Sequence, residues 1–246
     1  MHCQCVAAFL QKKGCCLCIG YTKRGTGMIQ AVLFDMDGTL IDTEKYYRRF
    51  WPMAMAEFGY HMTDEQVLSM RSLGRPFAPA QLKAWFGEDL DYYAIRARRT
   101  QIMEECLDKE GIRLKPGAVE ILEELKRRGI PAAVATATPP ERTEKYLALT
   151  GIRKYFSKII SATQVKEGKP SPDIYLYACE ELGLSPSQCM AVEDAPNGVL
   201  AAYRAGLKVV MVPDQTQPDE VLKKYLYACV PKLDDITALL IHETKE

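Results

Sequence analysis

The chain has 246 residues, of which 48% are hydrophobic and 26% charged, and its 32 Lys and Arg residues balance its 32 Asp and Glu residues. This neutral balance excludes a polycation that binds nucleic-acid backbones, and the composition excludes disordered and collagen-like chains. A chain of this length buries a substantial core and accommodates one large domain or two unequal ones. We therefore expect a globular protein with no nucleic-acid partner.

The cysteines are unevenly distributed. Nine are present, and five of them lie within the first 18 residues. An odd number without a regular framework argues against a disulfide scaffold. The C-x2-C spacing from Cys15 to Cys18 has no second pair nearby, which argues against a structural zinc site.

Residues 1–27 carry four basic residues and no acidic ones, and their apolar run, residues 6–10, is too short for a signal peptide or a membrane span. No other segment approaches 18 uninterrupted apolar residues. We expect an irregular, cysteine-rich, basic N-terminal extension, a working domain that begins at Met28, a cytoplasmic location and no membrane partner.

The first half of the chain predicts one strand followed by helices. Residues 29–34 are a short β-branched and aromatic run, typical of a buried strand. Residues 43–110 show the three- and four-residue apolar spacing of helices, and Thr63 and Gln66 have the spacing of a capping box. The helices are predicted over residues 43–58, in a short stretch from residue 63, over 79–86 and over 89–108.

From Gly111 onward, predicted helices alternate with short apolar strands. Thr138 precedes two prolines and is expected to cap the helix that follows it. The expected strands are residues 130–136, 158–161, 189–192 and 207–212, and the expected helices begin near residues 115, 138, 172 and 197.

This order predicts an α/β fold: a doubly wound, mostly parallel sheet with an inserted all-helical cap domain. The catalytic core is expected to comprise residues 28–42 and 111–246, and the cap residues 43–110.

Polar residues follow the ends of the predicted strands: Asp35 and Asp37, then Thr136, then Lys169, then Glu193 and Asp194. Ligands of parallel sheets bind at the carboxyl ends of the strands, so we expect these side chains to form one cluster. Several carboxylates at close range repel one another unless a cation lies among them. Oxygen ligands without a nearby histidine suit Mg2+, which we expect as the cofactor.

Four ordered motifs resemble those of the haloacid dehalogenase-like hydrolases, and most resemble the branch of sugar-phosphate phosphatases and β-phosphoglucomutases. They are Asp35-Met36-Asp37-Gly38-Thr39, Thr136 after an apolar strand, Lys169 in Gly168-Lys169-Pro170, and Glu193-Asp194-Ala195-Pro196-Asn197-Gly198. The resemblance covers residues 28–246 and implies the core fold and helical cap of that family.

The resemblance implies a role for each motif residue. Asp35 would attack phosphorus as the nucleophile, and Asp37 would be the general acid and then the general base. Thr136 and Lys169 would hold the phosphoryl oxygens. A departing alcohol needs a proton and a departing halide does not, so Asp37 favours phosphoryl transfer over dehalogenation.

The resemblance also implies how Mg2+ is bound. The ligands would be the carboxylates of Asp35 and Asp194 and the backbone carbonyl of Asp37, with Glu193 nearby.

Further substrate contacts are expected from four positions. Backbone amides at Gly38 and Ala137 can donate to phosphoryl oxygens. Arg75, in the predicted cap, is a candidate for reaching an anionic or hydroxyl-rich substrate, and Thr43, at the junction of core and cap, either lines the site or starts a helix.

The leading interpretation is a Mg2+-dependent phosphatase that hydrolyses a small phosphorylated metabolite, such as a sugar phosphate, through an aspartyl-phosphate. A β-phosphoglucomutase-like transfer is the nearest alternative, but family mutases usually carry a histidine where this chain has Tyr47. A phosphorylation-dependent signalling receiver and a non-catalytic binding protein are the alternatives from other classes. We expect a monomer or a weak homo-oligomer.

Overall fold

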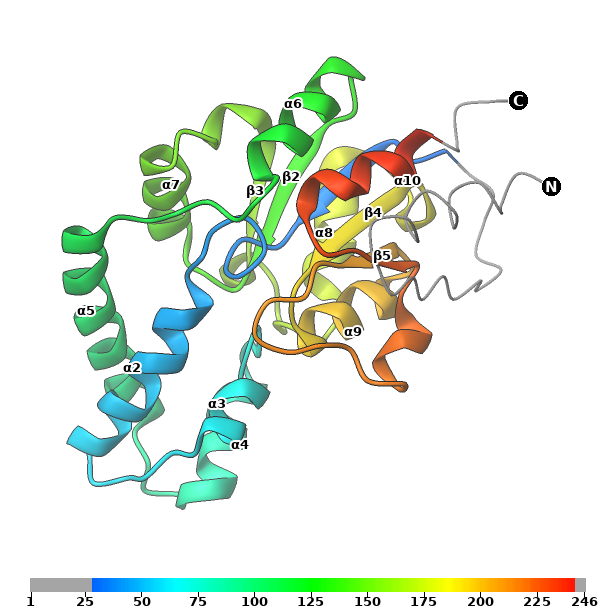
Figure 1. Ribbon diagram of the computed structural model, residues 1–246. Coiled ribbons are helices and arrows are strands. Elements are labelled where there is room, and N and C mark those ends of the chain that lie inside the picture. The colour runs from blue at the N-terminus through cyan, green and yellow to red at the C-terminus, as the bar shows by residue number, and fades with distance from the viewer. Residues whose placement is uncertain (1–27, 242–246) are drawn as a thin grey trace.

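The computed structural model describes residues 28–241 (Figure 1). The predicted extension over residues 1–27, with its cysteine cluster, lies outside the described residues. No helix within residues 28–241 is both long enough and apolar enough to cross a membrane.

The centre of the fold is a six-stranded parallel sheet with the strand order β3-β2-β1-β4-β5-β6. Its strands are β1 (Ala31–Phe34), β2 (Ala132–Thr136), β3 (Phe156–Ser161), β4 (Cys189–Glu193), β5 (Lys208–Met211) and β6 (Ala228–Cys229). The chain adds β2 and β3 on one side of β1, and then β4, β5 and β6 on the other side. The predicted doubly wound α/β fold class is therefore confirmed.

Helices cover both faces of the sheet, which explains why its central strands are continuous apolar runs. In β1, Val32 and Phe34 face one side and pack with α6 (Ala118–Arg127), α7 (Pro140–Leu149) and α10 (Thr237–Ile241). Ala31 and Leu33 face the other side and pack with α8 (Asp173–Leu182) and α9 (Pro196–Ala205). With both faces buried, β1 holds the residues that follow it in a fixed position.

A separate group of helices follows β1 in the chain and lies to one side of the sheet in Figure 1. It contains α2 (Glu44–Glu57), α3 (Asp64–Ser69), α4 (Phe77–Phe86) and α5 (Tyr92–Glu110), and we call residues 43–110 the helical segment. These helices share their own apolar cluster, which includes Trp51, Leu82 and Ile95. The predicted capping box of Thr63 and Gln66 is present at the start of α3. The division into core and cap domains stays a prediction.

Two features of the fold differ from the sequence prediction. Thr138 does not cap a helix, because α7 has Pro139 at its N-cap position and no side-chain capping bond. The hydroxyl of Thr138 instead donates to Asp37. The two-residue strand β6 and the short helix α10 were not predicted, since neither is long enough to show a periodic pattern.

Candidate active site

The predicted site residues meet at the carboxyl edge of the sheet. Strand β1 lies between β2 and β4, and Phe34 is paired in register with Val134 on one side and Val192 on the other. The three strands therefore end at nearly the same level. Carboxylate oxygens of Asp35, Glu193 and Asp194 lie within 4.8 Å of one another, and all three residues are buried.

Lys169 joins this cluster from the loop that precedes α8. Its side chain is fully buried, and its Nζ lies 2.5 Å from Asp35 Oδ1 and 2.6 Å from Glu193 Oε1. Burial alone would lower the pKa of Lys169, but the two carboxylates raise it above its ordinary value, so the ammonium stays charged. Tyr175, from α8, donates a further hydrogen bond to Glu193. Lys169 and Tyr175 therefore hold the same oxygen of Glu193, Oε1.

The carboxylates of the cluster carry more negative charge than Lys169 neutralises. Burial, opposed by Lys169 and reinforced by Asp35, raises the pKa of Glu193 to about 8, and burial also raises the pKa of Asp194 to about 7. Asp35 Oδ2 and Glu193 Oε2 are buried and have no hydrogen-bond partner among the described residues. Unpartnered carboxylate oxygens this close together form a donor set that fits a hard divalent cation.

Two glycines allow the carboxylates to approach the backbone. A Cβ atom at Gly38, where φ is +81°, would lie 2.3 Å from Asp194 Oδ2. A Cβ atom at Gly198 would lie 2.1 Å from Glu193 Oε2. The sequence predicts a substrate contact through the amide of Gly38, and it predicts no separate role for Gly198 in the fourth motif.

Asp37 is held by two threonine hydroxyls. Thr43 donates to Asp37 Oδ1 at 2.6 Å, and Thr138 donates to Asp37 Oδ2 at 2.7 Å. Thr43 is fully buried and, like Gly38 and Lys169, does not line the cavity that opens above this edge of the sheet. Thr136 accepts a hydrogen bond from the backbone amide of Thr138. Sequence reasoning missed Thr138 because a threonine before two prolines has the pattern of a helix cap.

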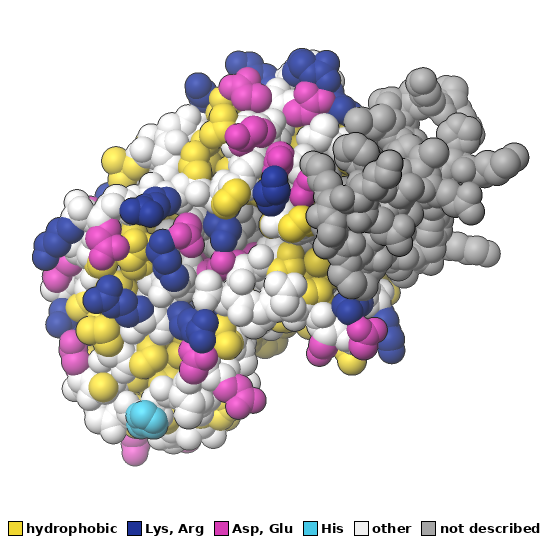
Figure 2. All heavy atoms as spheres, viewed as in Figure 1, with side chains coloured by type: hydrophobic (Ala, Val, Ile, Leu, Met, Phe, Trp, Pro, Cys, Tyr) yellow, Lys and Arg dark blue, Asp and Glu magenta, His cyan; other side chains and the backbone are white. Residues whose placement is uncertain are grey.

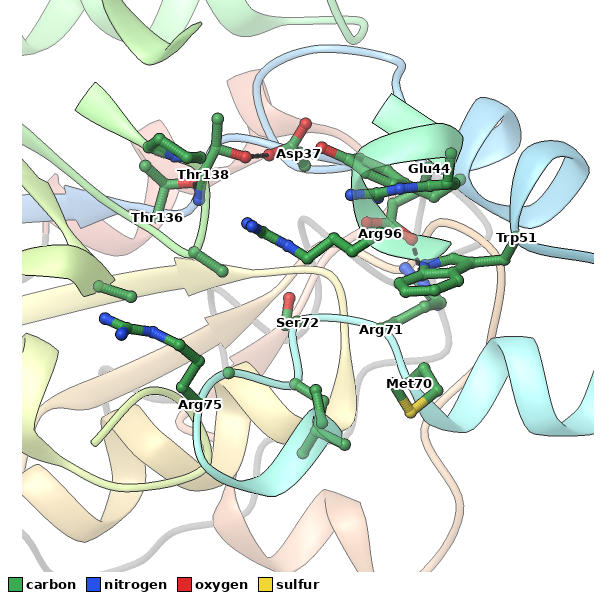
Figure 3. A pocket seen from close by; sticks show the side chains of 18 of the residues that line it. Asp37, Glu44, Trp51, Met70, Arg71, Ser72, Arg75, Arg96, Thr136 and Thr138 are labelled. Atoms are coloured by element: carbon green, nitrogen blue, oxygen red, sulfur yellow. Dashed lines mark hydrogen bonds and ion pairs between the residues drawn. The ribbon is translucent and has the colours of Figure 1, made fainter. Parts of the chain in front are cut away.

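A cavity of about 520 Å³ opens above this edge, between the sheet and the helical segment (Figure 3). Among the predicted site residues, Asp35, Asp37, Thr136 and Ala137 line it from the core, and Arg75 lines it from the helical segment. Five more arginines line the cavity and were not predicted: Arg48, Arg71, Arg96, Arg99 and Arg142. The spacing of Arg96 and Arg99, three residues apart on one helix, was the available signal.

The helical segment contacts the core directly at the site. Arg71 donates to the carboxylate of Asp194 and, at 3.1 Å, to Glu44. Burial and the neighbouring Asp194 raise the pKa of Glu44 well above its ordinary value.

A second contact joins the backbone of the helical segment to the backbone of the core: Gly74 N donates to Lys169 O at 2.8 Å, and Gly168 N donates to Arg75 O. A Cβ atom on Gly74 would lie 2.6 Å from the Cα of Gly168, so only glycine permits this approach. The loop that carries Arg75 is therefore fixed against the loop that carries Lys169.

Comparison with known proteins identifies the family. Residues 29–206 match the haloacid dehalogenase-like hydrolases. Hexitol phosphatase A of Escherichia coli K12 is 35% identical over 184 residues, which are 73% of this chain and 81% of that protein. Fructose-1-phosphate phosphatase YqaB of the same organism is 32% identical over 183 residues, covering 74% of this chain and 95% of that protein.

A solved structure of similar fold is that of a CbbY mutant from Rhodobacter sphaeroides in complex with xylulose-1,5-bisphosphate. It is 30% identical, superposes with a TM-score of 0.73 and covers 85% of this chain and 96% of its own. Because the family match spans most of the chain and the named relatives are phosphatases, the predicted phosphatase type of enzyme is confirmed, and the chain belongs to the haloacid dehalogenase-like hydrolases.

Proposed function

We propose that this protein is a Mg2+-dependent phosphatase that hydrolyses a small phosphorylated sugar through an aspartyl-phosphate intermediate. The observation that carries the proposal is the juxtaposition of Asp35, bonded to the buried Lys169, with Asp37, bonded to two threonines. Asp35 would attack phosphorus, and Asp37 would transfer the protons. The similarity to phosphatases of hexitol and fructose phosphates supports a sugar phosphate as substrate.

In the proposed mechanism, a carboxylate oxygen of Asp35 attacks phosphorus as the bond from phosphorus to the sugar oxygen breaks. Asp37 donates a proton to that departing oxygen and then takes one from the water that hydrolyses the aspartyl-phosphate. The phosphoryl oxygens would be held by four groups: the backbone amides at Gly38 and Ala137, the Thr136 hydroxyl and the Lys169 ammonium.

The donor set described above would hold Mg2+ through the carboxylates of Asp35 and Asp194 and the backbone carbonyl of Asp37, with Glu193 nearby. When bound, the ion would reduce the repulsion between the anionic nucleophile and the anionic phosphoryl group. Thr43 would position Asp37 through its hydrogen bond, instead of contacting the substrate.

We further propose that the helical segment, residues 43–110, acts as a cap that selects the substrate. Two observations support this proposal: the segment forms one wall of the cavity, and it contacts the carboxyl edge of the sheet directly. Arg75 is a substrate-binding candidate within it.

The test is release of inorganic phosphate from a panel of sugar phosphates, with Mg2+ and with EDTA. We expect activity that requires the metal and is lost in Asp35→Asn, whereas Asp42→Asn, which removes an acid paired with exposed Lys45, retains it. Activity that survives Asp35→Asn or EDTA would contradict the mechanism. An isomeric sugar phosphate that forms without release of phosphate would indicate a mutase instead.

A further inference from the structure

The cavity is lined by more arginine side chains than there are carboxylates paired with them. Six arginines line it, against the acidic residues Asp35, Asp37 and Glu44. Arg48 is paired with Asp64, and Arg71 with Glu44 and Asp194. The other four have no carboxylate within ion-pair distance in the part of the chain that the structure describes: Arg75, Arg96, Arg99 and Arg142.

Arg99, on α5, is the most deeply buried of these. Only 3% of it is exposed, and its guanidinium lies over the rings of Tyr47, at 4.6 Å, and Trp51, at 4.8 Å. One of its nitrogens donates to Thr100 Oγ1, but Nε has no hydrogen-bond partner among residues 28–241. Aromatic faces compensate part of the cost of burying a cation, and an unpaired N–H remains.

Arg142, at the start of α7, approaches the same point from the core. It donates to the hydroxyl of Thr100, the group that Arg99 also contacts, and its Nε is likewise buried and unpartnered within the described residues. Two guanidinium groups therefore converge from two different elements on one hydroxyl. Like charges repel at this range, so the arrangement favours an anion between or beside them.

Arg99 and Arg142 lie near Asp37, the proposed acid. Tyr47 lies close enough to Asp37, Arg142 and Arg99 for all three charges to act on its hydroxyl, whose pKa burial raises. Both arginines line the same cavity as Asp37, the proposed proton donor to the departing alcohol, and Arg142 follows by four residues Thr138, whose hydroxyl donates to Asp37.

Arg75 and Arg96 extend into the same cavity in Figure 3. On the face shown in Figure 2, basic and acidic side chains are interspersed. The cavity arginines are therefore not an extension of a basic patch on that face.

We propose that the alcohol part of the substrate carries a second anionic group, a phosphate or a carboxylate. Arg99 and Arg142 bind this group, and Arg96 and Arg75 contact it from the open side of the cavity. The proposal rests on the phosphatase function proposed above and narrows its substrate class. Guanidinium groups suit both anions, because their planar N–H donors match pairs of anionic oxygens. The cavity has room for a phosphorylated sugar with a second charged group.

Matched substrate pairs test this proposal. Fructose 1,6-bisphosphate is compared with fructose 1-phosphate, and 3-phosphoglycerate with glycerol 3-phosphate, by kcat/KM for phosphate release. We expect the doubly charged member of one pair to be preferred by about 10- to 100-fold, as charge-assisted hydrogen bonds allow. The pair that shows the preference identifies the second group as phosphate or carboxylate.

Arg142→Gln and Arg96→Gln should each lower this preference ratio at least severalfold. Arg98→Gln should keep it, because Arg98 lies on the same helix as Arg99 but is paired with Glu57 and does not line the cavity. These variants test the proposal without Arg99, whose replacement in a buried position can prevent folding. Equal kcat/KM within both pairs, or a ratio that Arg142→Gln leaves unchanged, would overturn the proposal.

Calorimetric binding to the Asp35→Asn protein separates this inference from the proposed function. Tighter binding of the doubly charged member with no hydrolysis by the wild-type enzyme would refute the phosphatase and support the anion subsite. Hydrolysis of both members with equal binding would refute the subsite and leave the phosphatase intact.

Discussion

Arg71, in the helical segment, donates a hydrogen bond to the carboxylate of Asp194, which follows β4. Both side chains are almost completely buried, and the same guanidinium also bonds Glu44. A cation that belongs to the protein therefore lies beside a candidate metal ligand. This contact couples the helical segment to the charge of the site, because Arg71 compensates two buried carboxylates at once.

Replacing Arg71 with methionine should destabilise the metal-free protein by about 3–5 kcal/mol, because Glu44 and Asp194 would be left as uncompensated buried groups. The measurement is urea unfolding in EDTA. Mg2+ should restore part of the loss, since a bound divalent ion would supply positive charge next to Asp194. Arg48→Met is the control, because Arg48 and Asp64 form an exposed pair of little energetic consequence. Equal effects of the two substitutions would contradict this prediction.

The threonine hydroxyls that donate to Asp37 should affect the rate most when the leaving group needs a proton. Thr43→Val and Thr138→Val should each lower kcat for a sugar phosphate by about tenfold, because each frees one oxygen of the proposed acid. Thr43→Ser and Thr138→Ser should retain most of the activity. With p-nitrophenyl phosphate, whose leaving group needs no proton, the loss should be smaller. A loss of the same size for both substrates would argue that the threonines only support the fold.

Gly198→Ala should weaken metal binding and destabilise the protein, although alanine in a helix normally gains up to about 1 kcal/mol over glycine. The added methyl would meet the carboxylate of Glu193, which cannot retreat easily because Lys169 and Tyr175 hold it. Calorimetric titration with Mg2+ and thermal unfolding in EDTA measure the two effects. An alanine variant that is more stable and binds Mg2+ normally would disprove the constraint.

The sequence was sufficient to predict the sheet and the motif residues at its edge, because apolar runs mark buried strands and parallel strands end at one edge. It was insufficient for contacts between elements far apart in the chain. The hydroxyl of Thr138 is 101 positions from Asp37, and its local pattern is that of a cap. Arg99 and Arg142 are separated by a helix end, a helix and a strand, so only the folded chain brings them to Thr100.

The stabilisation by Mg2+ should increase with pH. In the metal-free protein the pKa of Asp194 is about 7 and that of Glu193 about 8, both raised mainly by burial. A carboxyl group with a raised pKa in the folded state contributes full stability below its unfolded pKa, near 4, and loses that contribution as the pH rises through its folded pKa. In EDTA, these two groups should therefore lower the stability between about pH 4 and pH 8.

Protons and metal ions compete for the same oxygens, so the affinity for Mg2+ should rise over the upper part of this range. The measurement is the difference in Tm between Mg2+ and EDTA at pH 6, 7 and 8.5, which cancels the titration of groups distant from the site. We expect the difference to grow at each step and to become much smaller in Asp194→Asn, which removes a proposed metal ligand and one of the two titrating groups. A difference in Tm that is constant from pH 6 to 8.5 would show that Asp194 and Glu193 are already ionised at pH 6 in the metal-free protein.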